Sequence, residues 1–276
     1  MKILISADME GISGVVVWDQ VTPEHSEYLQ RFRSLMIGDV NAAIEGAFDG
    51  GATEVVVTDS HWYGLNLRLE DLDPRALLNS GLSSPLAMMQ GVDRGVDGVV
   101  LVGCHPRSGT RNATLDHTWS DVRVHNVWLD GELVGEIAMN AALAGSFGVP
   151  VLAVSGDQNA VAEARELLGE RLAMAVVKEA TGQFSAECKP LAVSRGLIRD
   201  AVRQGVKNLS LGTAPAPKVC RCPVELRLEF RHSRFADRAQ LMPGCERLDG
   251  RTVRFVAADV VNAWGAFRTL VAASRD

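Results

Sequence analysis

Short apolar runs alternate with helix-like patterns through the first two thirds of the chain. Residues 2–7, 54–58, 97–102 and 151–154 are apolar at nearly every position, which is typical of strands buried on both faces of a sheet. Apolar residues recur at helical spacing over 24–48, 136–147 and 160–168, and glycines follow the first two of these segments. This alternation predicts an α/β fold with a mostly parallel sheet flanked by helices.

The last third of the chain has a different pattern. A helix is expected over residues 191–206, and a loop over 212–223, which contains three prolines. Strands are expected at 224–230 and 252–256, with a closing helix over 258–272, while a further strand at 122–129, before the turn Asp130-Gly131, is expected in the middle of the chain. We therefore expect a single unit over residues 1–276, or two lobes with a smaller C-terminal α+β lobe and a boundary near 207–223.

Polar side chains follow three of the predicted strands. Asp8 and Glu10 follow the first strand, His61 the second and His105 the third. Because sites in parallel α/β sheets lie at the carboxyl ends of strands, these side chains are expected at one edge. Carboxylates and imidazoles are ligands that zinc and similar divalent metals accept. Asp8 and Glu10 lie two residues apart and so point the same way in an extended chain, which suits a two-metal site.

Each of these residues also has a simpler interpretation. Asp8 could form a turn or cap a helix, and His61 could be a strand-end histidine with an ordinary hydrogen bond. His105, beside Pro106, could lie in a turn. These interpretations must all hold at once at successive strand ends, whereas one metal site accounts for them together. The joint pattern therefore favours a metal centre.

Two further residues are candidates for the chemistry. His117 lies in a polar loop, where it could act as a general acid or base or stabilise an oxyanion. From the residues alone, an ordinary surface-loop histidine is the better interpretation. Glu136 begins a predicted helix, where the helix dipole favours a carboxylate. Gly135 before it would allow the backbone to approach another group closely.

Composition narrows the class of protein. The chain has 276 residues, 47% of them hydrophobic, and a net charge of −6, which argues against a general nucleic-acid binder. No apolar run reaches the length of a membrane-spanning helix, and the N-terminus lacks a signal-peptide pattern. We therefore expect no nucleic-acid or membrane partner and a cytoplasmic location. The five cysteines are scattered, which argues against a disulfide framework, and Cys220-Arg221-Cys222 is only a weak zinc-thiolate pattern.

Several separated motifs together resemble the DppA family of zinc D-aminopeptidases. The motifs match in order and spacing at residues 7–14 (ADMEGISG), 59–61 (DSH), 103–105 (GCH), His117 and 134–136 (VGE). The resemblance extends to residues 150–152 with 156–157, to 185–188 and to 241–244. It covers nearly the whole chain. It implies two Zn²⁺ ions held by the residues that match the family's ligands, namely Asp8, Glu10, His61, His105 and Glu136. It further implies that Asp8 bridges the ions and that His117 is the catalytic residue.

The resemblance also implies an activity and an assembly. Family members hydrolyse short peptides from a free N-terminus, so we expect a zinc-dependent aminopeptidase that uses a metal-activated water on small, D-amino-acid-containing or otherwise unusual peptides. A ring-like homo-oligomer, a decamer with an internal chamber, is expected as well. The sequence departs from the family at 62–64 and 107–111, which flank the ligands. Two alternatives are a metal-dependent phosphoesterase and a non-catalytic metal- or ligand-binding protein on the same fold.

Overall fold

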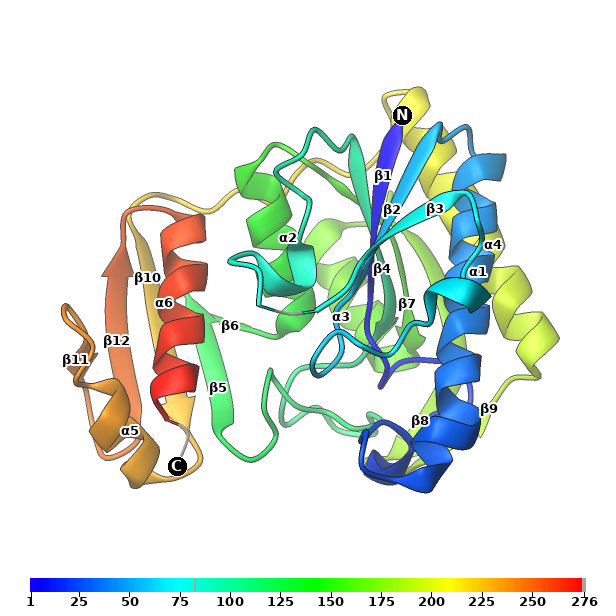
Figure 1. Ribbon diagram of the computed structural model, residues 1–276. Helices are drawn as coiled ribbons and strands as arrows, with labels where there is room; N and C mark the ends of the chain where they lie inside the picture. Colours follow the sequence, from blue (N-terminus) through cyan, green and yellow to red (C-terminus); the bar gives the residue numbers. More distant parts are fainter. Residues whose placement is uncertain (82, 275–276) are drawn as a thin grey trace.

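A seven-stranded sheet forms the centre of the larger part of the molecule (Figure 1). The computed structural model describes residues 1–81 and 83–274. The strands of this sheet are parallel except the edge strand β9, which runs antiparallel to β8. In spatial order they are β3 (Ala76–Asn79), β2 (Glu54–Asp59), β1 (Lys2–Ala7), β4 (Gly98–Cys104), β7 (Val151–Asp157), β8 (Ala173–Gly182) and β9 (Ser185–Cys188).

Helices cover both faces of this sheet. The helices α1 (Arg33–Asp49) and α4 (Leu191–Ser210) pack on one face, where Ile3 and Ile5 of β1 belong to the same buried cluster. The helices α2 (Glu136–Ser146) and α3 (Gln158–Leu168) lie on the other face, with Leu4. The alternation along β1 thus divides the core into two layers, as expected for an α/β fold. Among the described residues, no helix has the length and apolar character needed to cross a bilayer.

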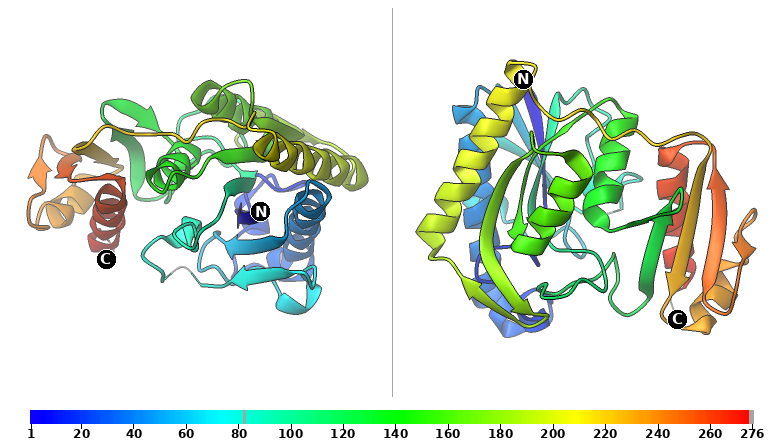
Figure 2. Two further views of the ribbon diagram at one scale, coloured as in Figure 1. Left: turned by 90° about the horizontal axis from the view of Figure 1, so that it is seen from above. Right: turned by 180° about the vertical axis from the view of Figure 1, so that it is seen from behind.

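A second, antiparallel sheet forms the smaller lobe (Figures 1 and 2). The helix α6 (Val260–Ala273) packs against it and against α2, so one buried cluster joins the two sheets. The extended segment 211–223 carries the chain from α4 to this lobe. The order of its strands is β11 (Glu246–Arg247), β12 (Thr252–Ala257), β10 (Val224–Phe230), β5 (Val124–Leu129) and β6 (Glu132–Val134), with the helix α5 (Ser233–Ala239) beside them.

The α/β class, the mostly parallel sheet and the smaller α+β lobe are confirmed. The second lobe also takes β5 and β6 from the middle of the chain, because β5 pairs with β10. The boundary near 207–223 stays a prediction. The predicted helix over 24–48 contains a π-helical turn at Tyr28–Phe32 before α1. The closing helix begins at Val260 rather than at 258, because the side chain of Asp259 caps its first turn by accepting from the amide of Asn262.

The sequence patterns did not predict several short or interrupted elements. β8 was missed because a lysine and a glutamate interrupt its apolar run. The others have little periodicity, since each is only a few residues long. They are β3, β6, β9, α5 and β11, together with the 3₁₀ turns at Trp18–Gln20, Leu69–Asp71 and Ala87–Met89.

The order of the strands determines where a site can form. β2 and β4 pair with opposite sides of β1, and all three strands are parallel. The chain therefore changes direction across the sheet at β1, and a crevice is expected beyond the carboxyl ends of β1 and β4. Asp8 follows β1 directly, His105 follows β4 directly, and His61 lies two residues after β2.

The segments that follow β1 and β4 contact each other backbone to backbone. The amide of Gly11 donates to the carbonyl of Gly103 at 2.8 Å. A Cβ atom on Gly11 would lie 1.9 Å from the carbonyl oxygen of Cys104, and one on Gly103 would lie 2.2 Å from that of Asp8. Gly103 also has a φ of +74°, a conformation that favours glycine. Only glycine therefore allows the segments of Asp8 and His105 to meet.

We expect Gly11→Ala to lower the free energy of unfolding by at least ~1–3 kcal/mol, because the added methyl group forces two backbone segments apart. Urea denaturation followed by circular dichroism measures the change. Gly196→Ala is the matched control: a Cβ there meets nothing within 4 Å, and alanine stabilises a helix interior by roughly 0.5–1 kcal/mol. Equal stability of Gly11→Ala and the wild-type protein would contradict the close backbone contact.

Candidate metal centre

All six residues that the sequence analysis selected meet at the carboxyl edge of the parallel sheet. Each is buried, with at most 8% of its surface exposed. Three are carboxylates and three are histidines: Asp8, Glu10, Glu136, His61, His105 and His117. Three acidic groups buried this deeply require protons, protonated partners or bound cations to balance their charge.

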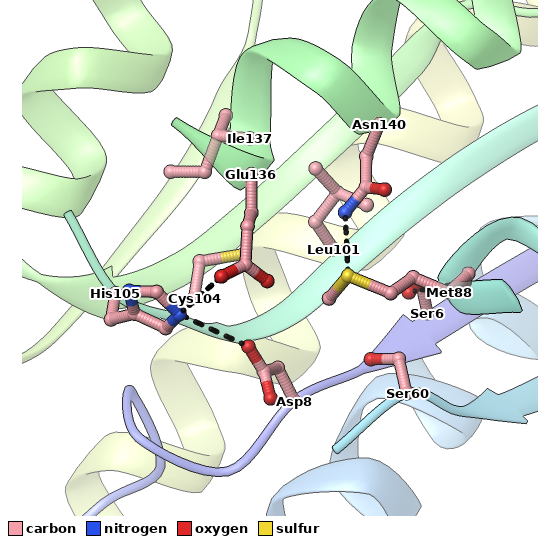
Figure 3. Close-up of a pocket in the computed structure, with 10 residues that line it drawn as sticks. All are labelled: Ser6, Asp8, Ser60, Met88, Leu101, Cys104, His105, Glu136, Ile137 and Asn140. Carbon is pink, nitrogen blue, oxygen red and sulfur yellow. Dashed lines mark hydrogen bonds and ion pairs between the residues drawn. The ribbon is translucent and has the colours of Figure 1, made fainter. Parts of the chain in front are cut away.

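Asp8 lies between two halves of the cluster. Its Oδ1 is 3.2 Å from Nδ1 of His61, and its Oδ2 is 3.5 Å from Nε2 of His105. Glu10 Oε2 is 3.1 Å from the same nitrogen of His61, and Glu136 Oε1 is 3.3 Å from the same nitrogen of His105. Each half therefore contains one histidine and one glutamate, and the two oxygens of Asp8 face different halves. Figure 3 shows the half that contains His105 and Glu136.

His117 is part of the cluster as well. Its Nε2 lies 3.9 Å from Oε1 of Glu136, and its ring stacks on that of His105 with centroids 4.0 Å apart. The indole of Trp18 meets the His117 ring edge-on at 5.2 Å. The interpretation of His117 as an ordinary surface-loop histidine is therefore wrong. The ligand atoms of His105, His117 and Glu136 lie within 4.8 Å of one another, as do those of Asp8, Glu10 and His105.

Backbone carbonyls fix which nitrogen of each histidine carries a proton. Nε2 of His61 lies 2.8 Å from the carbonyl of Val21. Nδ1 of His105 lies 3.0 Å from that of Pro106, and Nδ1 of His117 lies 2.9 Å from the carbonyl of its near neighbour at position 115. Because a carbonyl oxygen can only accept, these three nitrogens are the N–H donors. The other nitrogen of each ring faces the carboxylates, which is the usual arrangement of metal-binding histidines.

The charges of the cluster shift one another's pKa values. Burial and the neighbouring Glu10 raise the pKa of Asp8 to about 7. Burial disfavours the charged form of His61, but Glu10 and Asp8 outweigh it and raise the pKa of His61 well above its usual range. Burial likewise disfavours the charged form of His105, but the nearby carboxylates, Glu136 above all, outweigh it and raise the pKa of His105 well above its usual range. In the absence of a cation, protons on these groups balance the buried carboxylates.

His117 is the exception among the histidines. Burial and the nearby His105 lower its pKa, so its imidazole is neutral at physiological pH. Its free nitrogen can then accept a proton. The structure thus separates one neutral histidine from two that are charged in the absence of a metal.

The residues fit a pair of divalent metal ions. Oε2 of Glu10 and Nε2 of His105 are buried and make no hydrogen bond of acceptable geometry within the described part of the chain. Buried polar atoms without a partner are uncommon and indicate a missing ligand. Carboxylate oxygens and imidazole nitrogens are donors that zinc accepts. The adjacent Cys104 keeps its proton, since burial raises the pKa of its thiol well above the usual range.

Sequence reasoning missed a buried lysine behind the cluster. Lys178 of β8 is completely buried, and its Nζ donates to the carbonyls of Glu10, Ile12 and Val15 at 2.7, 3.2 and 2.5 Å. It thus holds the segment that carries Glu10. A lysine within an otherwise apolar strand run was the signal that could have identified it.

Asp157 and Asn140 also have positions that the chain pattern alone did not reveal. Asp157 accepts hydrogen bonds from the amide and hydroxyl of Thr114 at 2.8 and 2.9 Å, which anchors the loop of His117. Its other oxygen caps α3.

Asn140 lies in α2 beside the cluster, opposite Met88. In the sequence, Asn140 is an amide side chain within an otherwise apolar stretch of helix, and this feature could have identified it.

Comparison with known proteins identifies the family. The model of the M55 peptidases, described as D-aminopeptidase, matches residues 1–269. The chain belongs to this family. It is 35% identical over 267 residues to the D-aminopeptidase of Bacillus subtilis (strain 168), covering 96% of this chain and 95% of that protein.

A solved structure of an M55 peptidase has the same fold. It is described as the zinc-dependent D-aminopeptidase DppA from Bacillus subtilis, a self-compartmentalizing protease. The match has a TM-score of 0.94 and 33% identity, and it covers 99% of this chain and 98% of that chain. The resemblance, the fold class and the peptidase class predicted from the sequence are confirmed. The roles of the individual site residues stay predictions.

We expect metal binding to this M55 peptidase to release protons, because His61 and His105 must lose a proton before they can bind a metal. Roughly one to two protons should leave per protein at pH 7, and zinc affinity should rise with pH. Titration calorimetry of the metal-free protein with Zn²⁺, in buffers of different ionisation enthalpy, measures the number. His61→Gln should release fewer protons. A binding enthalpy independent of the buffer would contradict the proton balance.

Proposed function

We propose that this protein is a zinc-dependent D-aminopeptidase that removes the first residue of short peptides. The observation that carries the proposal is the group of six buried carboxylates and histidines arranged around Asp8 in a chain of the M55 family. The description of the DppA relative as zinc-dependent supports the choice of metal.

The two halves of the cluster would each hold one ion. Glu10 and His61 would bind the first, and His105 and Glu136 the second. Asp8 would bridge them, since its two oxygens face different halves. When bound, a zinc pair supplies a water activated at neutral pH and a Lewis acid for the scissile carbonyl.

His117 would act as the acid–base residue. Its Nδ1–H donates to the carbonyl of Leu115, which holds the ring in one orientation and leaves Nε2 free. Its lowered pKa keeps Nε2 unprotonated at neutral pH. Nε2 can therefore take a proton from the attacking water and give it to the amine that leaves. In the protonated state it can also stabilise the oxyanion.

We propose that the protein forms a closed, ring-like homo-oligomer, a decamer, whose chamber admits only small peptides. The self-compartmentalizing character of the DppA relative supports this assembly. Side chains such as Tyr63, Leu65 and Leu69, after His61, expose more than 60% of their surface and could pack between copies. A cytoplasmic location is proposed from the sequence alone.

We expect the zinc-loaded protein to hydrolyse D-dipeptides faster than matched L-dipeptides. Activity should disappear on treatment with a chelator and return with Zn²⁺, because the metal pair supplies the activated water. The assay compares both dipeptide series with aminoacyl-p-nitroanilides and p-nitrophenyl phosphate. Hydrolysis of the phosphate ester alone would indicate a phosphoesterase. Full zinc occupancy without any hydrolysis would indicate a binding protein.

For His117→Ala we expect both zinc ions to remain bound and kcat to fall by roughly 10²–10⁴, the usual effect of one acid–base or oxyanion group. Zinc content and kcat are measured on the same preparation. His25→Ala is the control, since the side chain of His25 is half exposed and its ion pair is with Asp19, outside the cluster. Loss of zinc would make His117 a ligand, and an unchanged kcat would remove it from the reaction.

A further inference from the structure

Trp119 joins the proposed metal ligand Glu136 to the second lobe. Its backbone amide donates to Oε1 of Glu136 at 2.6 Å, the same oxygen that lies 3.3 Å from Nε2 of His105. A hydrogen bond from an amide to a carboxylate is charge-assisted and strong, so it holds this oxygen in a fixed position. Because the backbone makes the contact, it depends on the conformation of residue 119 rather than on the chemistry of its side chain.

The backbone of Trp119 has a conformation that tryptophan rarely adopts. Its φ is +64°, in the left-handed region, where a Cβ atom is crowded and glycine is favoured. Bulky residues persist in this region only where the surrounding structure holds them, and such positions concentrate at functional sites. Residue 119 lies two positions after His117, in the segment that leads from the cluster to β5. The conformation that accompanies the amide contact therefore needs support from elsewhere.

The indole of Trp119 supplies this support through α6. It meets the rings of Trp264 and Phe267 edge-on, with centroid distances of 5.7 and 5.5 Å and interplanar angles of 90° and 84°. Both partners belong to α6 and expose at most 4% of their surface. Aromatic pairs in this geometry contribute more than the area they bury. The same helix packs against α2, which Glu136 begins. One helix of the second lobe therefore supports both the donor and the acceptor of the hydrogen bond.

We propose that Trp119 is a positioning residue for the second metal ion: its indole, anchored on α6, maintains the backbone conformation whose amide orients Glu136. The inference rests on the proposed role of Glu136 as a ligand of that ion. Without the anchor, residue 119 relaxes to a negative φ and its amide leaves the carboxylate. Loss of a group that orients a metal ligand typically costs 10–100-fold in metal affinity. The first ion, between Glu10 and His61, does not depend on this contact.

The test is calorimetric titration of the metal-free protein with Zn²⁺, which measures the affinity of each ion. Trp119→Ala removes the ring but keeps a Cβ atom in the left-handed conformation. Its affinity for the second ion should fall roughly 10–100-fold, while that for the first stays within about twofold. Trp119→Gly removes the ring and the strain together, so it should bind the second ion about tenfold more tightly than Trp119→Ala. Trp119→Phe keeps an aromatic ring against α6 and should bind both ions like the wild-type protein.

The comparison of alanine with glycine separates positioning from packing. If the ring of Trp119 only filled space between the lobes, both variants would lose it equally. Glycine would then be no better than alanine, since ordering glycine costs more conformational entropy. Trp128→Ala is the matched control, because Trp128 lies half-buried in β5 of the same lobe, opposite Arg227 and Leu133. It should leave both zinc affinities unchanged.

Glu136→Ala is measured beside these variants, because it shows the loss expected when the carboxylate itself is absent. Equal zinc affinities of Trp119→Ala and the wild-type protein, or of the alanine and glycine variants, would overturn the positioning role. An unchanged second affinity in Glu136→Ala would overturn it together with the ligand role. Should the Trp119 variants not fold, Trp264→Leu removes the contact from the side of α6 and decides by the same loss of the second ion. If no peptide is hydrolysed, the proposed function fails, and the zinc affinities still decide the role of Trp119.

Discussion

The burial of negative charge at one edge of the parallel sheet is the constraint on which the site depends. Three carboxylates and three histidines lie together with almost no contact with solvent. In such a place the carboxylates are stable only with a positive partner, so each half of the cluster pairs a glutamate with a histidine. A metal ion can replace the protons that otherwise hold these pairs together. The groups that balance charge in the free protein are thus the same groups that are proposed to bind the metals.

The surrounding fold maintains this arrangement through backbone contacts rather than through the ligands themselves. Gly11 and Gly103 allow the ends of β1 and β4 to meet, which brings Asp8 and His105 within reach of each other. Lys178 holds the segment after β1 by three carbonyl groups, and Asp157 anchors the loop of His117. These contacts lie outside the cluster of ligands. These contacts hold the candidate ligand side chains in place without a metal, so the chain would need to change little when an ion binds.

The histidines differ in charge although they share one site. His61 and His105 face carboxylates at 3.1–3.5 Å and are readily protonated, whereas His117 faces its nearest carboxylate only at 3.9 Å and stacks on His105. Its imidazole consequently stays neutral. This difference in charge fits the proposed roles, in which His117 carries protons and His61 and His105 bind the metals.

Sequence patterns alone were enough to predict the class of fold and to select most of the candidate ligand residues. Apolar runs identified β1, β2, β4 and β7, and polar residues directly after three of them indicated Asp8, Glu10, His61 and His105, because parallel strands end at a common edge. Family resemblance added the roles of Glu136 and His117.

Contacts between segments far apart in the sequence became visible only in the folded structure. It brought His117 from a polar loop into the cluster, joined β5 and β6 to the strands of the last third, and buried Lys178 against carbonyls more than 160 residues away. It also placed Asn140 opposite Met88 across a small cavity. Residue type and local periodicity carry no information about such pairings. The burial and the neighbours of a side chain are set by how the sheets and helices pack, and the pKa and partners of each site residue follow from that packing.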